Sequence, residues 1–213
     1  MDPGIPDMNL FMMCEKLCVT ACTPMPSGYH VRVCRPDELD LWKDIHYDDE
    51  ETALTERPYM NYYFDQVFKK KEDLFFQSCL FICDRTDTPV GTCFAWKAYD
   101  VFTTIQWFKV RRSHEGCGIG RALLSLVMMA LDEGSYPVLL HTQPASYRAI
   151  KLYSDFGFAL LSNADMGLRS NDLAAALPIL EHLMRPEDFK QLQFSVAPPY
   201  CIDAITSSKM HQF

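Results

Sequence analysis

Three glycines precede an apolar helical pattern in the stretch RRSHEGCGIGRALL, residues 111–124. Gly116, Gly118 and Gly120 stand at every second position, although glycine is a poor helix former. A helix that begins here leaves its first N–H groups without partners inside the helix, and its dipole places about half a positive charge at this end. Because glycine has no Cβ, a phosphate can approach such amides closely. The stretch therefore predicts an anion site. The flanking arginines that can add charge-assisted hydrogen bonds are Arg111, Arg112 and Arg121.

Two common phosphate-binding loops do not fit this stretch. A Walker loop needs Lys followed by Ser or Thr after its last glycine, and here Arg121 and Ala122 follow. A dinucleotide-binding loop needs Gly-x-Gly-x-x-Gly and an acidic residue at the end of the next strand. The spacing here is Gly-x-Gly-x-Gly, and the next strand ends in His141 and Thr142. Both classes are therefore excluded.

Strands with tight turns precede the glycines. Residues 29–36, YHVRVCRP, alternate in polarity and predict a strand that Pro36 stops. Residues 79–100 predict a hairpin whose first strand ends at Asp84 and whose second begins at Val90. TTIQWFKV, residues 103–110, is rich in β-branched and aromatic residues and predicts a third strand. Strands joined in this way form an antiparallel sheet.

After the glycines, the pattern of apolar residues predicts a helix, a strand, a second helix and a second strand. Gly134 and Pro137 are expected to end the first helix. Ser146 is expected at the N-cap of the second helix, and Gly157 at its C′ position. The fold class is therefore α/β of the α+β type, with a mixed, mostly antiparallel central sheet flanked by helices. The expected strands are VLLHT at 138–142 and FALL at 158–161, and the second helix covers 146–156.

The two ends of the chain differ from this central part. Residues 1–28 are expected to form an irregular N-terminal arm, 29–167 the central domain, and 168–213 a helical C-terminal extension packed on the same domain. Within the central domain, residues 37–72 predict two helical pieces that break near ERPY, residues 56–59. Within the extension, we expect one helix in NDLAAALPILEHLM, a shorter one near PEDFKQLQF, and no regular structure after APPY.

Composition excludes several classes of protein. The 213 residues carry a formal net charge of -8, which argues against a general binder of nucleic acid or of an anionic membrane. No stretch reaches the roughly 18 apolar residues of a membrane span, and Asp2 and Asp7 stand where a signal peptide has basic residues. We therefore expect a cytoplasmic protein.

Cysteine usage gives a further expectation. The nine cysteines form no CxxC pair, so they predict buried, reduced thiols. Cys14, Cys18 and Cys22 are spaced by four, but no His or Cys follows at zinc-site spacing, and no metal is expected.

The glycine stretch resembles the acetyl-CoA pyrophosphate loop of the GNAT superfamily of N-acetyltransferases. That pattern is Arg/Gln-x-x-Gly-x-Gly/Ala at the start of a helix, and Gly118 and Gly120 match its two small positions. A second family motif, Asn-x-x-Ala-x-x-x-Tyr followed by Gly-Phe, resembles SYRAIKLYSDFGF, residues 146–158, which supplies Ala149 and Tyr153. The two motifs occur in the family's order, and the resemblance covers about residues 29–162.

Two residues depart from the family pattern. Glu115 occupies the Arg/Gln position, and its side chain would repel a phosphate, so we expect it to point away while its backbone N–H binds. Ser146 replaces the usual Asn and is expected still to cap its helix.

The resemblance implies direct transfer of an acetyl group from acetyl-CoA, a cosubstrate, to an amine in a ternary complex. It implies main-chain contacts from Phe108 and Val110 to the pantetheine arm, and coenzyme contacts from Ser146 and Tyr153. Tyr153 would also be the general acid that protonates the departing thiolate, and a packed core tyrosine is the alternative. The amides implied to hold the pyrophosphate are those of Glu115, Gly116, Cys117, Gly118, Ile119, Gly120 and Arg121.

The base and the acceptor are less constrained. His141, at the end of its strand, is the candidate base, and a packed, hydrogen-bonded histidine is the alternative. The strand before the loop contains no glutamate, so a base acting through water is a further alternative. The acceptor is an amine of a small molecule or of a protein or peptide, and the acidic residues 37–56 suggest a cationic one. A homodimer is left open. The alternative function is an acyl-CoA-binding sensor or scaffold without turnover.

Overall fold

A computed structural model of the chain describes residues 4–213, which form two compact units. The first unit comprises residues up to Ala21 together with Lys97–Thr104 and Asp132–Phe213, and the second comprises Cys22–Trp96 and Ile105–Leu131. These units cut across the boundaries expected at residues 28 and 167. Within residues 4–213, no helix is both long and apolar enough to cross a membrane.

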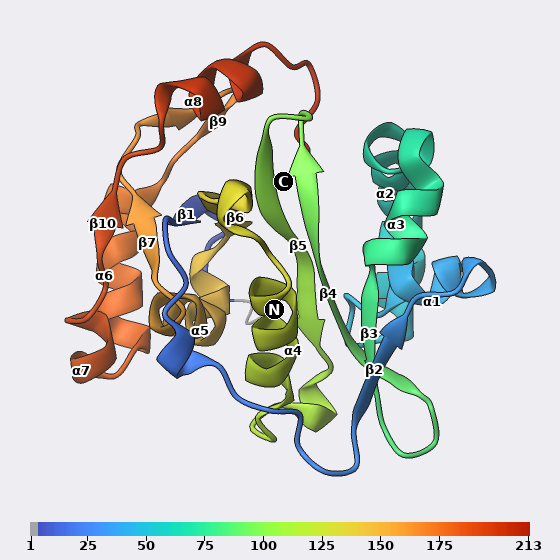
Figure 1. The fold of residues 1–213 in the computed structure, drawn as a ribbon. Helices are drawn as coiled ribbons and strands as arrows, with labels where there is room; N and C mark the ends of the chain where they lie inside the picture. Colours follow the sequence, from blue (N-terminus) through green and yellow to red (C-terminus); the bar gives the residue numbers. More distant parts are fainter. Residues whose placement is uncertain (1–3) are drawn as a thin grey trace. The chain divides into compact units, whose positions relative to one another are not determined.

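The second unit contains the predicted antiparallel meander. Its strand order is β5-β4-β3-β2, and the hairpin of β3 and β4 lies beside β2 (Figure 1). Cα partners such as Leu80 with Cys93 and His30 with Cys83 set the antiparallel registers. The strands are β2 (His30–Val33), β3 (Leu80–Cys83), β4 (Pro89–Ala98) and β5 (Phe102–Val110), the last two of which continue into the first unit.

The helices of the second unit correct one prediction. α1 spans Leu39–Asp44, α2 spans Glu50–Val67, and α3 spans Glu72–Ser78. The predicted break near residues 56–59 is wrong, because α2 continues through Pro58. Proline removes the hydrogen bond to the carbonyl four residues earlier, and its ring crowds that carbonyl. Here both Pro58 and Leu54 are exposed, so the carbonyl can tilt outward and be solvated by water.

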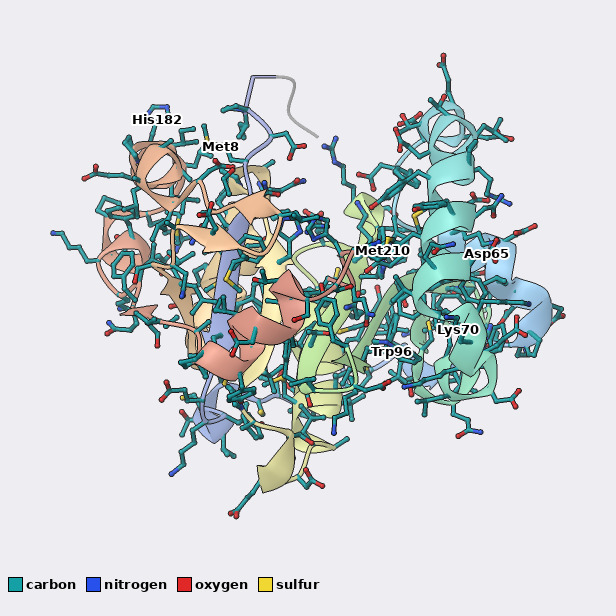
Figure 2. All side chains as sticks on the ribbon, turned by 90° about the horizontal axis from the view of Figure 1, so that it is seen from above. Met8, Asp65, Lys70, Trp96, His182 and Met210 are labelled. Atoms are coloured by element: carbon teal, nitrogen blue, oxygen red, sulfur yellow. The ribbon has the colours of Figure 1, made fainter. Side chains whose placement is uncertain are left out.

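The break between helical pieces falls instead before Glu50. Asp49 is the N-cap of α2, and its carboxylate accepts a hydrogen bond of 2.8 Å from the backbone N–H of Thr52. Figure 2 shows Asp65 on this helix and Lys70 in the turn that follows it.

Aromatic side chains form much of the core of the second unit. Trp42 is fully buried, and its ring lies edge-on to those of Phe75, Phe68 and Trp107, with centroids 4.9, 5.9 and 5.9 Å away. Edge-on packing is favourable for aromatic pairs beyond the area that they bury. α1, α2 and α3 are thereby held against β4 and β5.

The first unit shows that the prediction of an irregular arm is wrong. Leu10–Cys14 form strand β1, which pairs antiparallel with β6 (Val138–Thr142) and with β7 (Phe158–Leu161). All five residues are buried. A strand that is apolar on both faces is stable only in the middle of a covered sheet. The order is β10-β7-β1-β6-β5, with β6 parallel to β5.

The segment after residue 164 has more regular structure than predicted. Regular structure does not end at APPY, because α8 begins at Pro199, and proline suits the first turn of a helix. Cys201, Ile205 and Phe213 join Phe11 and Leu139 in one buried cluster of the first unit. The elements are β8 (Asp165–Met166), β9 (Arg169–Ser170), α6 (Leu173–Leu183), α7 (Pro186–Phe189), β10 (Phe194–Ser195) and α8 (Pro199–Thr206).

Gly157 ends helix α5 (Tyr147–Asp155) as predicted, with a φ of 95°. A Cβ at this position would lie 2.7 Å from the backbone oxygen of Lys16. We expect Gly157→Ala to lower the free energy of unfolding by about 2 kcal/mol or more, because left-handed strain and this overlap add. Urea unfolding measures the loss.

Gly134→Ala is the matched control for this change. Gly134 has no positive φ, and the nearest atom to an added Cβ is Asp132 Oδ1 at 3.6 Å. We expect this variant to unfold within about 0.5 kcal/mol of the wild type. Equal stability of the two variants would show that the backbone at Gly157 relaxes freely.

Candidate functional site

The loop between β5 and helix α4 (Ile119–Met129) has the glycine-dependent geometry that the sequence suggests. A short 3₁₀ turn, Arg112–His114, follows β5, and Gly116 and Gly118 then adopt φ angles of 75° and 80°. A residue with a Cβ is strained in this left-handed region, whereas glycine adopts these angles freely. Both glycines are therefore required by the path of the backbone.

Gly120 has a different role, because it allows close packing. A Cβ at this position would lie 3.3 Å from Phe108 Cζ and 3.5 Å from Val110 Cγ2. The first turn of α4 thus lies against the two β5 residues that the resemblance assigns to the coenzyme. The structure brings these predicted site residues together.

The start of α4 is open to solvent. Residues 115–118 are exposed, a Cβ on Gly116 would meet no atom within 4 Å, and one on Gly118 would meet Pro26 Cγ at 3.7 Å. The N–H of Ala122 donates to the oxygen of Gly118, at 3.1 Å, as the first intrahelical bond. The amides of Ile119 and Gly120 precede it, in the first turn, where a helix offers its N–H groups no partner of its own. This surface can accept an anion.

Arg111 adds a buried donor beside the loop. Its backbone N–H donates to Val90 O on β4 at 2.8 Å, which fixes the end of β5. Its side-chain Nε is buried, and no hydrogen-bond partner for it occurs in the described part of the chain. A buried donor without an acceptor is costly, so this guanidinium is suited to an anionic group.

Glu115 is exposed, and its backbone is already in use. Its N–H donates to Arg112 O at 3.2 Å and closes the 3₁₀ turn. The amide that was expected to face a phosphate therefore has a partner within the loop. The amides that follow it in the chain are the better candidates.

Trp107 is a feature of β5 that sequence reasoning missed. Its φ is 49°, an outlier for a bulky residue in a strand. Such a residue interrupts the regular hydrogen-bond ladder, and strained backbone of this kind clusters at functional sites. The sequence TTIQWFKV gives no signal of it, because most of its residues, Trp107 included, favour a strand.

His46 is a second feature that was missed. Its ring lies 4.6 Å from that of Trp107, and its buried Nε2 has no hydrogen-bond partner within residues 4–213. Burial, and then the charge of Lys109, lower the pKa of His46 to about 3. The imidazole is therefore neutral beside the irregular part of β5. A single histidine in an acidic stretch carried no pattern that could have identified it.

His141, in the first unit, has the contacts of a packed histidine. Its Nε2 lies 3.0 Å from Asn9 Oδ1, to which it donates, and its ring lies 5.0 Å from that of Phe11. Burial, followed by the charges of Arg169 and His211, lowers the pKa of His141 to about 3. These contacts are those of the packed, hydrogen-bonded histidine that the sequence analysis gave as the alternative to a base.

Helix α5 carries the other two predicted residues. Tyr153 is 6% exposed, and its ring lies 5.8 Å from that of Phe158. Ser146 stands at the N-cap, but the prediction that it caps the helix is wrong, because its side chain makes no cap hydrogen bond. Ser146 ends a 3₁₀ turn with φ and ψ of -91° and 28°, far from the extended conformation of a capping serine.

The two low histidine pKa values predict a pH-dependent stability. An unfolded histidine titrates near 6.5, so the stability from keeping His141 neutral is complete above that pH and is lost as the pH falls toward 3. Each such group adds a slope of up to about 1.4 kcal/mol per pH unit in this window. We expect His141→Gln, which keeps an N–H donor, to lose about 2 kcal/mol less than the wild type between about pH 7 and pH 5. Urea unfolding at both pH values measures this, and equal losses would contradict it.

The cysteine side chains differ in one respect from the prediction. All nine thiols are free, but Cys18 and Cys117 are exposed and Cys22 is half-buried, so the prediction that the cysteines are buried is wrong for these three. His30, Cys83 and Asp87 lie close enough to share a metal ion. Arg32 Nε lies 2.8 Å from Asp87 Oδ1, so a guanidinium already holds that carboxylate.

Comparison with known proteins identifies the family. Residues 39–158 match the model of the acetyltransferase (GNAT) family. A GCN5-related N-acetyltransferase from Sphaerobacter thermophilus is 20% identical, with a TM-score of 0.45 over 68% of this chain and 47% of that chain. A GNAT-family protein from Novosphingobium aromaticivorans is 13% identical, with a TM-score of 0.44 over 73% of this chain and 62% of that chain.

A conserved protein of unknown function from Staphylococcus epidermidis is 13% identical, with a TM-score of 0.47 over 74% of this chain and 59% of that chain. The chain thus spans between 47% and 62% of the length of these three structures. No curated protein matches it. The family model covers more than half of the 213 residues, and the chain belongs to the GNAT family of acetyltransferases.

Proposed function

We propose that this chain is an acetyl-CoA-dependent N-acetyltransferase, which moves the acetyl group directly to an amine in a ternary complex. The observation that carries the proposal is the exposed start of α4, where Gly116 and Gly118 hold left-handed backbone angles directly after β5. This geometry suits an anion that approaches the first amides of a helix. Family membership supports acyl transfer as the reaction.

The loop would hold the pyrophosphate of the coenzyme. Arg111 supplies a buried Nε that has no acceptor within residues 4–213, and a phosphate oxygen would satisfy it. The backbone of Phe108 and Val110 would contact the pantetheine arm, as the resemblance implies. Ser146 and Tyr153 remain proposed contacts from α5. The amides proposed for the pyrophosphate are those of Gly116, Cys117, Gly118, Ile119, Gly120 and Arg121.

The chemistry needs a donor for the negative charge that develops on the acetyl oxygen. A backbone N–H of β5 next to Trp107 is our candidate, because the positive φ turns the chain out of the regular ladder there. Tyr153 would protonate the departing thiolate, and a phenol remains protonated at neutral pH. This role is a proposal from the motif.

We propose that the proton of the acceptor amine is removed by water, or that the amine binds in its neutral form and needs no base. A general base works best when its pKa lies near the working pH. The pKa values of His141 and His46 are about 3, so either imidazole would be a weak base. β5 has no acidic side chain to replace them.

The acceptor is proposed to be an amine of a small molecule or of a protein or peptide. Much of the acidic run that suggested a cationic acceptor is already engaged. Asp44 and Asp40 pair with Arg57, and Asp48 pairs with Lys109 at 3.0 Å. Within the described residues, the acidic side chains of this run that have no salt bridge lie on α2 and its N-cap, at Asp49, Glu50, Glu51 and Glu56. We do not propose that the chain binds nucleic acid or a membrane. We propose a cytoplasmic location, and we leave open whether the chain forms a homodimer.

A protein that binds acyl-CoA without turnover is the second candidate. The low pKa values of His141 and His46, and the absence of an acidic residue from β5, favour it. Both candidates require the coenzyme site, so they share the first test.

Thermal unfolding with and without CoA tests that site. A ligand that binds only the folded chain adds about 2.7 kcal/mol of stability at 100 times its Kd. We expect the midpoint to rise with CoA concentration and, above the Kd, to keep rising with the logarithm of that concentration. No rise at any concentration would overturn both candidates.

A further inference from the structure

A cavity of about 400 Å³ in the second unit is not used by the proposed reaction. Its walls come from the chain entering β2 and from the turn between β3 and β4. The lining residues are Ser27, Gly28, Tyr29, Asp84, Arg85 and Thr86.

Arg85 gives this cavity a cationic donor. Its guanidinium lies against the backbone of Gly28, where an added Cβ would be 2.9 Å from Arg85 Nε. In the part of the chain that the structure describes, Arg85 has no hydrogen bond and no ion pair with another side chain. Three other arginines of this unit are paired with carboxylates: Arg32 with Glu38, Arg57 with Asp44 and Arg112 with Asp48. The planar fork of Arg85 therefore remains available to a ligand.

The cavity reaches the loop that precedes α4. The hydroxyl of Tyr29, one of the lining residues, lies 3.1 Å from His114 Nδ1 in the 3₁₀ turn. Burial, and then the thiol of Cys117 between the two left-handed glycines, raise the pKa of the Tyr29 phenol. A ligand bound to the loop amides would therefore have this cavity next to it.

Asp84 is the one acidic group that lines the cavity, and its own turn uses its charge. Its Oδ1 accepts the N–H and the hydroxyl of Thr86, at 2.8 and 2.7 Å, and the N–H of Thr88 at 3.1 Å. These three donors hold the carboxylate in the turn and offset part of its repulsion of an anion.

We propose that this cavity binds the 3′-phosphate on the ribose of coenzyme A, with Arg85 as its charged donor. The inference rests on the proposed function, since it places a second phosphate group of the same molecule beside the pyrophosphate loop. A phosphate monoester carries more negative charge than either group of the pyrophosphate, and a guanidinium binds it through two parallel N–H bonds. Arg85 then makes the protein select CoA over 3′-dephospho-CoA.

Calorimetric titration with CoA and with 3′-dephospho-CoA tests this selection. We expect the wild type to bind CoA about tenfold more tightly than 3′-dephospho-CoA, because one exposed charge-assisted contact is lost with the 3′-phosphate. Arg85→Gln should bring the two affinities within about twofold by weakening CoA alone. Lys70→Gln, which removes an exposed positive charge from the turn after α2, should keep the preference.

Four outcomes would overturn the inference. Equal wild-type affinities for the two ligands, or a preference that survives in Arg85→Gln, would contradict it and leave the proposed function intact. Failure of the wild type to bind either ligand would overturn both proposals. Loss of 3′-dephospho-CoA binding in Arg85→Gln would show that the arginine supports the loop itself and not the 3′-phosphate.

Discussion

Replacing Gly118 with aspartate should weaken coenzyme binding strongly while leaving the chain folded. Aspartate tolerates left-handed backbone better than most residues do, and a negative charge suits the N-terminus of a helix. The space is open, with Pro26 Cγ at 3.7 Å as the nearest atom to an added Cβ. A carboxylate about 5 Å from a phosphate costs about 3 kcal/mol at an effective dielectric constant near 20. We therefore expect a loss of CoA affinity of at least about 100-fold.

Gly118→Asn is the matched control, because it has the same shape and backbone demand without the charge. We expect its CoA affinity to exceed that of Gly118→Asp by at least about tenfold, with both variants folded in the absence of ligand. Calorimetric titration measures both variants. Equal affinities for the two would mean that no phosphate approaches the start of α4.

Tyr153→Phe should lower kcat by about 100-fold or more with little change in KM for acetyl-CoA. Proton transfer by a positioned side chain contributes about this much, and the loss falls in the transition state if the tyrosine is the general acid. The buried ring remains, so its packing against Phe158 is kept. Steady-state kinetics at saturating amine measures both constants.

Tyr147→Phe makes the same change at the first residue of the same helix. We expect it to retain kcat, which would separate a specific role of Tyr153 from a general effect on α5. An unchanged kcat in Tyr153→Phe would leave this residue as part of the core, which is the reading that its burial alone supports.

Local signals explain the parts of the fold that were predicted. The hairpin of β3 and β4 is marked by turn residues, and the helix after Gly118 by its 3.6-residue apolar period. The left-handed angles at Gly116, Gly118 and Gly157 follow from residue type. Each of these features depends on neighbours in the sequence, so the sequence is sufficient to predict them.

The features that were missed depend on distant contacts. Residues 10–14 read as an apolar patch, and only pairing with β6 and β7, far along the chain, makes them a buried strand. The positive φ of Trp107 sits in a run of good strand formers. The unpartnered Nε2 of His46 results from packing against an aromatic cluster. None of these has a residue pattern of its own.

Thiol release from acetyl-CoA in the presence of a mixed panel of amines tests the proposed transferase activity most directly. We predict release that depends on both the enzyme and at least one amine, with the acetylated amine identified by its mass. Saturable binding of CoA without thiol release from any amine in the panel would contradict the proposed transfer and favour a binding protein.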